Sequence, residues 1–305
     1  MRDYDVVVIG AGLAGLTAAM TAAKHGLSTA VVDQMGAGGQ VLNVEKIENL
    51  PGFPEGIAGY DLGPIVQEQA EAAGAEFYLD SVESLDLEGV LRIVRGAEEE
   101  LRAPTVIIAA GSSLRNLGIP GEERLTGHGV SHCASCDGPF FAGNSVAVVG
   151  GGDSAIEEAA VLTNHVERVL VFHNGESLGA QQTLINAVEG KPSIEFYYNS
   201  EVEEILGENG VTALKVRDKT TGESREEAVA GVFVYVGLEP NTSFLQGVVD
   251  LDAGGHIVTD VMMRTSLPGV FAAGDIRQSS VSLVSSVMGD GATAAVAAYR
   301  YIYGL

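Results

Sequence analysis

The chain has 305 residues and is 46% hydrophobic, which is enough for two hydrophobic cores at about 100–200 residues per domain. Its 41 acidic and 17 basic residues give a formal charge of -24, which disfavours sequence-independent binding to nucleic acid and to anionic membrane surfaces. Only two cysteines are present, so a framework of several disulfides is excluded, and a reducing, cytoplasmic location is expected.

A first strand-turn-helix pattern occupies residues 5–33. Residues 5–9 form an apolar run rich in β-branched side chains, a glycine-rich segment 10–15 follows, and a helix is expected to about His25. Residues 29–33 predict a second buried strand that ends in an acid. This order and spacing fit the Rossmann βαβ unit, which binds dinucleotides.

Each residue type in this unit has a physical role. Gly10 makes the tight turn, Gly12 lets the backbone approach a pyrophosphate, and Gly15 lets helix and strand pack closely. Asp33, about 20 residues further on, would accept a hydrogen bond from a ribose hydroxyl. The uncharged run 6–23 has the look of a membrane helix or an export signal. Its glycines and the acidic residues before it argue against both, so we expect no targeting segment and no membrane span.

The cysteines Cys133 and Cys136 lie three positions apart. A disulfide that closes so short a loop stiffens the chain little, so a reactive pair is favoured over a structural one. A zinc site would need four ligands, and although His128 and His132 are near, His132 abuts Cys133 and would strain a tetrahedral site, so no metal is predicted. His132 is either a cation that stabilises the Cys133 thiolate or a packing residue.

The strand-turn-helix pattern recurs with an apolar run at 145–149, the segment 150–155 and a helix to about Asn164. Residues 231–236 predict another buried strand, and residues 270–275 a strand that returns to the first domain. We therefore expect an α/β fold with two Rossmann-like dinucleotide-binding domains of the three-layer ββα type, the second inserted in the first. The expected boundaries are 1–113 plus 243–305 for the first domain and 114–242 for the second.

These motifs resemble the low-molecular-weight thioredoxin reductases, which are FAD-dependent pyridine nucleotide-disulfide oxidoreductases of type II. The resemblance covers essentially the whole chain. It rests on the segments Gly10-Ala11-Gly12-Leu13-Ala14-Gly15, Gly38-Gly39-Gln40, Glu48-Asn49-Leu50-Pro51-Gly52, Ala109-Ala110-Gly111, Cys133-Ala134-Ser135-Cys136-Asp137, Gly150-Gly151-Gly152-Asp153-Ser154-Ala155 and Gly274-Asp275.

The resemblance implies that the first domain holds FAD and that the second carries the dithiol and a second dinucleotide site. Val82 would lie near the adenine of FAD. The implied FAD-binding residues are Gly10, Gly12, Ala14, Asp33, Gly39, Gln40, Asn49, Val82, Gly111, Gly274, Asp275, Leu283 and Val284. The implied second site comprises Gly150, Gly152, Asp153, Ser154 and Asn174.

The resemblance also implies a path for electrons. The flavin would reduce the disulfide through Cys136, and Cys133 would exchange with a thioredoxin-like protein or a small disulfide. Thiolate is the attacking species, and a Cys-x-x-Cys pair near a helix start has a lowered pKa. Asp137 would manage protons, or would only cap a helix. A homodimer is implied as well.

The chain departs from the family pattern in the second domain. Members that use NADPH grip its 2′-phosphate with His-Arg-Arg and a further arginine, whereas the matching segment 173–179 has no arginine. Each charge-assisted hydrogen bond is worth ~1.5–3 kcal/mol, so losing two or three should weaken NADPH binding on the order of a thousandfold or more. NADPH is therefore disfavoured, and NADH stays open. A second departure replaces the Arg-Gln pair beside the flavin with residues 281–284.

Relatives without the basic clamp take electrons from ferredoxin or a deazaflavin, or hold a second flavin in the nucleotide site. Ferredoxins are usually acidic and would be repelled by so acidic a chain, which favours the second flavin. Two other functions stay open: a dithiol oxidase that passes electrons to oxygen, and a non-catalytic flavin redox sensor. Tyr301 and Tyr303 would cover an aromatic cofactor face or anchor the last helix.

Overall fold

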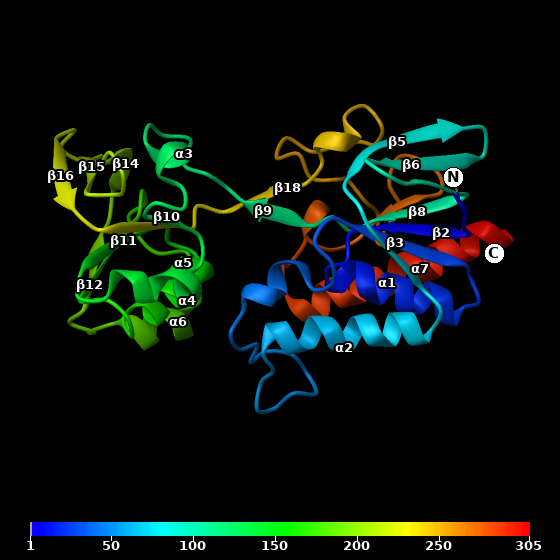
Figure 1. Ribbon diagram of the computed structural model, residues 1–305, viewed down its shortest axis with the longest axis horizontal. Helices are drawn as coiled ribbons and strands as arrows, with labels where there is room; N and C mark the ends of the chain where they lie inside the picture. The colour runs from blue at the N-terminus through cyan, green and yellow to red at the C-terminus, as the bar shows by residue number, and fades with distance from the viewer. Residues whose placement is uncertain (1) are drawn as a thin grey trace. The chain divides into compact units, whose positions relative to one another are not determined.

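The computed structural model describes residues 2–305, and the chain divides into two compact units. Unit 1 comprises Met1–Ser113 and Glu239–Leu305, and unit 2 comprises Leu114–Leu238 (Figure 1). Unit 2 is thus inserted in the sequence of unit 1. The strands β9 (Ser112–Leu114) and β18 (Leu238–Pro240), where the chain passes from one unit to the other, pair as a two-stranded sheet.

Unit 1 is built on a parallel sheet in the order β19-β8-β2-β3-β4. Its strands are β2 (Val6–Ile9), β3 (Thr29–Asp33), β4 (Glu76–Leu79), β8 (Thr105–Ile108) and β19 (Val270–Ala272). The central strands are buried along their whole length because layers cover both faces of the sheet.

The helices of unit 1 cover one face of this sheet (Figure 1). They are α1 (Leu13–Lys24), α2 (Gly59–Ala72) and α7 (Val284–Tyr303). The other face packs on a second sheet in the order β1-β7-β6-β5, which is antiparallel except for the β1 pairing. Its strands are β1 (Arg2–Asp3), β5 (Val82–Glu88), β6 (Leu91–Gly96) and β7 (Glu100–Ala103). The unit therefore has three layers, ββα. Three short 3₁₀ helices, η1 (Gly39–Asn43), η3 (Ser243–Leu245) and η4 (Gly274–Ile276), complete it.

Unit 2 repeats the three-layer plan on a parallel sheet in the order β10-β17-β11-β12-β13. Its strands are β10 (Val130–Ser131), β11 (Ser145–Val149), β12 (Arg168–Phe172), β13 (Ile194–Tyr197) and β17 (Gly231–Val234). The helices α4 (Ala134–Asp137), α5 (Asp153–Leu162) and α6 (Gln182–Val188) lie on one side. An antiparallel sheet of β14 (Ser200–Leu206), β15 (Ala213–Asp218) and β16 (Ser224–Ala228) covers the other. The remaining short elements are α3 (Glu122–Leu125) and η2 (Gly138–Phe141).

The strands and helices around the two glycine-rich turns lie where the sequence predicts them. The predicted strands 29–33 and 145–149 match β3 and β11, and β19 joins the sheet of unit 1 beside β8. That strand ends at Ala272, earlier than predicted, because Gly274–Ile276 turns into η4. In residues 2–305, no helix is long and apolar enough to cross a membrane.

Candidate cofactor pocket and redox centre

A pocket of about 360 Å³ opens at the carboxyl ends of the parallel strands in unit 1. Ligands of doubly wound α/β folds bind at this edge, where loops from several strands meet. The predicted FAD-binding residues that line it are Gly10, Gly12, Ala14, Asp33, Gly39, Gln40, Gly111, Gly274, Asp275, Leu283 and Val284. Two of the predicted residues, Asn49 and Val82, do not belong to this lining.

The three glycines of the first turn have different surroundings. Gly10 has a positive φ of 103°, and a Cβ there would lie 2.3 Å from the carbonyl oxygen of Ala109. A Cβ on Gly15 would lie 1.9 Å from the carbonyl oxygen of Gly10, so helix α1 packs directly on the turn. A Cβ on Gly12 would meet nothing within 4 Å, so the backbone there faces open space. The turn is therefore closely packed at Gly10 and Gly15 and open at Gly12.

The carboxylate of Asp33 already has backbone partners in this structure. Its Oδ2 accepts from the amide of Ala11 at 2.7 Å, and its Oδ1 accepts from the amides of Met35 and Gly36 at 2.8 and 2.9 Å. Asp33 therefore joins the glycine turn to the loop that follows β3, and its predicted bond to a ribose would add to these contacts.

A buried ion pair fixes the other wall of the pocket. Asp290 on α7, 7% exposed, accepts from Arg277 at 2.6 and 3.0 Å and from the amide of Gly274 at 3.2 Å. This pair holds the turn that carries Asp275 against α7. Asp290 was not among the residues predicted from the sequence, although a lone acid in an apolar helix was a usable signal.

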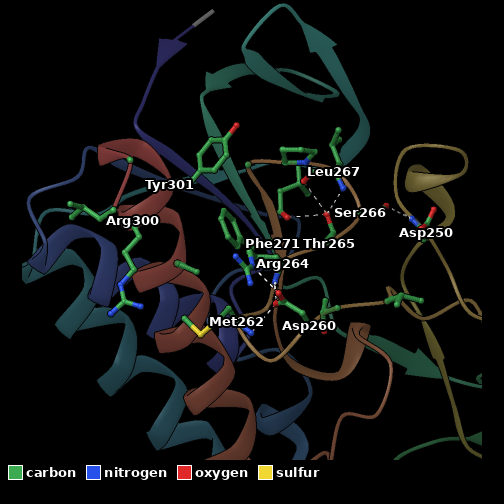
Figure 2. A pocket seen from close by; sticks show the side chains of 18 residues that line it. Asp250, Asp260, Met262, Arg264, Thr265, Ser266, Leu267, Phe271, Arg300 and Tyr301 are labelled. Atoms are coloured by element: carbon green, nitrogen blue, oxygen red, sulfur yellow. Dashed lines mark hydrogen bonds and ion pairs between the residues drawn. The ribbon is translucent and has the colours of Figure 1, made fainter.

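A larger cavity of about 880 Å³ lies elsewhere in unit 1, beside the end of α7 (Figure 2). Tyr301 lines it, and its ring meets the ring of Phe271 edge-on at 6.4 Å. The ring centroids of Tyr303 and Tyr299 lie 4.8 Å apart. Neither Tyr301 nor Tyr303 lines the pocket of the glycine turn, which favours the helix-anchoring interpretation of the terminal tyrosines.

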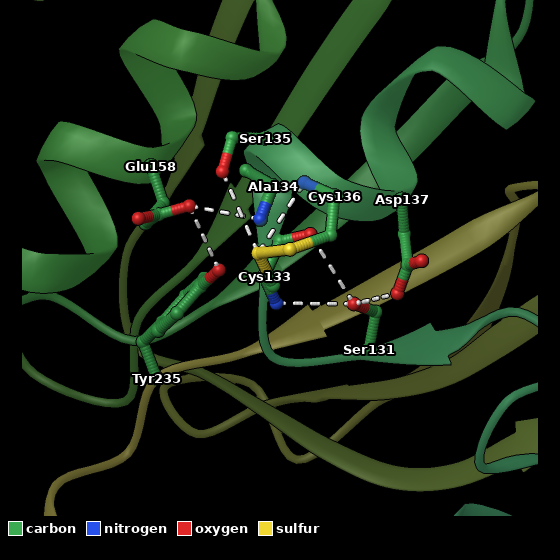
Figure 3. The surroundings of a disulfide bond; sticks show 8 residues. All are labelled: Ser131, Cys133, Ala134, Ser135, Cys136, Asp137, Glu158 and Tyr235. Atoms are coloured by element: carbon green, nitrogen blue, oxygen red, sulfur yellow. Dashed lines mark hydrogen bonds between the residues drawn. A yellow bond between two sulfur atoms is a disulfide. The ribbon is translucent and has the colours of Figure 1, made fainter. Parts of the chain in front are cut away.

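In unit 2, Cys133 and Cys136 form a disulfide with a Cα–Cα distance of 5.3 Å (Figure 3). Cys133 is the N-cap of the short helix α4, and its Sγ accepts from the amide of Cys136 at 3.3 Å. An amide that points at sulfur stabilises a thiolate more than a thiol. Cys136 is exposed and Cys133 is half-buried, so solvent reaches both sulfur positions to different extents.

Polar side chains flank the disulfide on two sides (Figure 3). On one side the hydroxyl of Ser131 donates to Asp137 at 2.5 Å and accepts from the amide of Cys133 at 3.1 Å. On the other side Glu158 accepts from the amide of Ala134 and from the hydroxyl of Tyr235. Asp137 makes no side-chain capping bond to η2, so the capping interpretation of this acid is not supported.

The surroundings of His132 favour its neutral form. Burial lowers the pKa of its imidazole below the usual value, and the charge of Glu122 offsets this only in part. The interpretation of His132 as a packing residue is therefore favoured over a role in stabilising the Cys133 thiolate by charge.

The second glycine turn is tied to the segment that follows β12. Asp153 accepts from the backbone amide and the side-chain amide of Gln181 at 2.7 and 2.6 Å. A Cβ on Gly151 would lie 2.3 Å from the ring of His173, whereas a Cβ on Gly152 would meet nothing within 4 Å. Lys219 donates to the carbonyl oxygen of Asn174 at 2.9 Å and brings one cation to this loop.

The family model of the pyridine nucleotide-disulphide oxidoreductases matches residues 4–294 of the chain. The chain belongs to this family. A thioredoxin reductase of Streptomyces clavuligerus is 42% identical over 304 residues, which cover 99% of this chain and 94% of that protein. A thioredoxin reductase of Treponema pallidum is 40% identical over 301 residues, which cover 98% of this chain and 97% of that protein.

Among solved structures, the thioredoxin reductase of Lactococcus lactis in its FR conformation matches with a TM-score of 0.96 at 39% identity. The match covers 99% of this chain and 100% of the other. The predicted fold of two Rossmann-like domains is confirmed, and this family member is an FAD-dependent disulfide oxidoreductase of the thioredoxin reductase type.

The pocket of unit 1 fits the FAD that this family requires. Helix α1 begins at Gly12 without a side-chain cap, so its first amides are open to a pyrophosphate, which helix N-termini bind well. The open backbone at Gly12 lets such a group approach. The pocket residues named above would hold the cofactor, and that assignment stays a prediction for each of them.

Proposed function

We propose that this enzyme passes electrons from FAD to the Cys133–Cys136 disulfide and on to a thioredoxin-like protein, and that its electron donor is not NADPH. The observation that carries the proposal on the donor is the segment 173–179 after β12, which has no arginine. Lys219 brings a cation to this loop, where its side chain donates to the carbonyl oxygen of Asn174. One lysine replaces little of a clamp built from several arginines.

The same loop favours a second flavin over the other donors. Helix α5 begins at Gly152 without a side-chain cap, and Gly152 faces open space, so a pyrophosphate site is retained where the 2′-phosphate clamp is lost. A site for NADH usually has an acid at the end of the second strand, which accepts from the ribose hydroxyls. Here β12 ends at Phe172 and is followed by His173, so this acid is missing. Ferredoxin and deazaflavin are the alternative donors, and the charge of -24 opposes the first.

The chain's own residues account for the exchange with the partner. FAD, when bound, supplies the two electrons that open the disulfide, and two protons complete the dithiol. The Cys133 thiolate, next to the Cys136 amide, then attacks one sulfur of the partner disulfide. Cys136 attacks the mixed disulfide, which restores the Cys133–Cys136 bond and releases the partner as a dithiol. Asp137, held by Ser131, would accept and return protons in these steps.

An exposed aromatic side chain in the segment after the disulfide supports a protein partner. Phe140, four residues after Cys136, is 81% exposed, which is unusual for so large an apolar side chain. An aromatic side chain at this place would contact the partner as the sulfurs approach. A cytoplasmic location and a homodimer stay predictions of the family resemblance.

The test is an anaerobic reoxidation experiment on the FAD-loaded protein, reduced with dithionite. Oxidised thioredoxin should restore the absorbance of oxidised flavin in the wild type, and both Cys133→Ser and Cys136→Ser should fail to do so. Failure of the wild type would contradict the reductase function. Rapid reoxidation of a dithiol-reduced wild type by air would point instead to the dithiol oxidase.

The two serine variants also test the order of the cysteines. A single remaining cysteine cannot resolve a mixed disulfide, so the exchanging cysteine should trap thioredoxin. We expect Cys136→Ser to accumulate the trapped complex on non-reducing gels. Trapping by Cys133→Ser alone would assign the exchange to Cys136 and leave the function intact.

A further inference from the structure

Glu158 joins three elements around the disulfide. It projects from α5, and its Oε2 accepts from the amide of Ala134 at 2.9 Å and from the hydroxyl of Tyr235 at 3.1 Å. Ala134 is fully buried and is the first residue of α4, directly after Cys133. Tyr235 is 7% exposed and follows β17. One carboxylate oxygen therefore links the start of α4, directly after Cys133, to helix α5 and to the end of strand β17.

The donor pattern shows which form of Glu158 fits. The Ala134 amide can only donate, and the same oxygen also accepts from the Tyr235 hydroxyl, so Oε2 carries no proton, and two donors on one oxygen favour the ionised carboxylate. Burial and the charge of Glu158 raise the pKa of Tyr235, so the phenol keeps its proton. Figure 3 shows this pair on the opposite side of the disulfide from Asp137 and Ser131.

We propose that Glu158 is a positioning residue that anchors the start of α4 and whose negative charge beside Cys133 makes the Cys133/Cys136 pair a stronger reductant. A carboxylate near a thiolate repels it, so the dithiol form loses stability relative to the disulfide, in which no sulfur is charged. Tyr235 keeps the charge in place and limits its effect by hydrogen bonding. A stronger reductant gives up its electrons more readily, as a reductase needs.

Other titratable groups around the start of α4 also contribute to the pH dependence of the cysteine pair. Asp137 lies on α4 itself, and His132 adjoins Cys133. His165, after α5, packs against Gly138 at the start of η2. Because these groups stay unchanged in the variants below, a shift in the titration of Cys133 reports the Glu158 charge alone.

The test compares Glu158→Gln with Glu157→Gln in the full-length, FAD-loaded protein. Gln keeps an acceptor oxygen for Ala134 and Tyr235 and removes the charge, and Glu157 is the exposed neighbour on the same helix. The disulfide is first reduced with dithionite under anaerobic conditions, and alkylation of Cys133 by iodoacetamide is then followed against pH, with Cys133 and Cys136 quantified separately by mass spectrometry. We expect the midpoint for Cys133 to fall by about half a unit to one unit in Glu158→Gln and to stay in place in Glu157→Gln.

A second readout is the equilibrium of the dithiol with glutathione buffers. At a pH above the wild-type midpoint of Cys133, the dithiol form of Glu158→Gln should be favoured by roughly three- to tenfold over the wild type, which is the same shift expressed as an equilibrium constant. Neither readout needs thioredoxin or the natural donor, so it does not depend on the proposed function.

Further variants keep the inference open to failure. If Glu158→Gln folds poorly, Glu158→Ala removes the same charge and must shift both readouts in the same direction. Tyr235→Phe retains the charge and must not lower the Cys133 midpoint. Unchanged midpoints in both charge-free variants, or a shift in Glu157→Gln as large as in Glu158→Gln, would overturn the proposal.

Discussion

The carboxylate of Asp80 links the segment before β5 to the turn between β6 and β7 in unit 1. It is 7% exposed and accepts from backbone amides at distances of 2.8 to 3.1 Å. The donors are the amides of Ser81, Ala97, Glu98 and Glu99. Burial alone would raise the pKa of Asp80, but the amide donors outweigh it and lower that pKa below its usual value.

We expect Asp80→Asn to reduce the free energy of unfolding by about 1–3 kcal/mol, because the amide group offers one acceptor oxygen to these donors and turns N–H groups toward the others. Chemical denaturation at pH 7 measures this, with the exposed Glu88→Gln as a control that should change little. Since the folded pKa is depressed, the contribution of Asp80 is present above about pH 4 and is lost as the pH falls through the folded pKa. An equal loss in Asp80→Asn at pH 7 and well below pH 3 would contradict this account.

Residues joined across the sequence are the ones that sequence reasoning missed. Glu158 lies in the helix after the second glycine turn, and Tyr235 comes directly after the apolar strand β17. At neither position does the local sequence indicate that the polar side chain lies near the cysteines. The two side chains meet because β17 pairs with β11 in the parallel sheet and so ends beside α5. The lone acid Asp290 stands out in an apolar helix, but its partner Arg277 could not be predicted, because no helical or strand periodicity relates residues 13 positions apart across a turn. The cysteines and glycines, in contrast, carry their chemistry in adjacent positions and were predictable.

Helices α1 and α7 pack closely against each other, and both contribute residues to the lining of the cofactor pocket. A Cβ on Gly291 of α7 would lie 2.1 Å from the carbonyl oxygen of Ala14 and 3.1 Å from the amide of Ala18. The helices therefore approach as closely as they do only because position 291 has no side chain. Ala14 lines the pocket, so the spacing of these helices also sets the shape of the site.

We expect Gly291→Ala to push the helices apart, to destabilise the protein by about 1–3 kcal/mol and to lower its FAD content. The matched control is Gly289→Ala on the same helix, where a Cβ meets nothing within 4 Å. Alanine should stabilise the helix there by roughly 0.5–1 kcal/mol. Thermal unfolding and the flavin-to-protein absorbance ratio measure both variants. Equal behaviour of the two would contradict the role given to Gly291.

The periodic elements were the predictable part of the fold. Short β-branched runs next to glycine turns predicted β2, β3 and β11 because a buried parallel strand must be apolar on both faces. The end of β19 was less predictable, since Ala273 continues the apolar run after the strand has ended at Ala272. Asn49 lies outside the pocket lining in the irregular segment between η1 and α2, whose path local sequence does not determine, and Val82 lies outside it as the first residue of β5.

The molecule as a whole combines the parts of a thioredoxin reductase with a segment 173–179 that has no arginine, and on this segment we base the proposal that NADPH is not the donor. The chain retains an open glycine turn in each unit and a disulfide held between two polar clusters. The departure that concerns NADPH lies in one loop after β12. Longer side chains fit at two positions of the loop: Asn174 is exposed, and a Cβ on Gly179 would meet nothing nearer than the Gly151 oxygen at 3.8 Å. The loss is therefore one of charge and not of shape.

An anaerobic titration of the FAD-loaded protein with NADPH and then NADH, following the flavin absorbance, tests whether the enzyme accepts electrons from either nucleotide. We predict that neither nucleotide bleaches the flavin of the wild type at micromolar concentration, and that the double variant Asn174→Arg/Gly179→Arg gains a response to NADPH. Rapid bleaching of the wild type by micromolar NADPH would contradict the account and show that another group, with Lys219 the first to replace, supplies the missing charge.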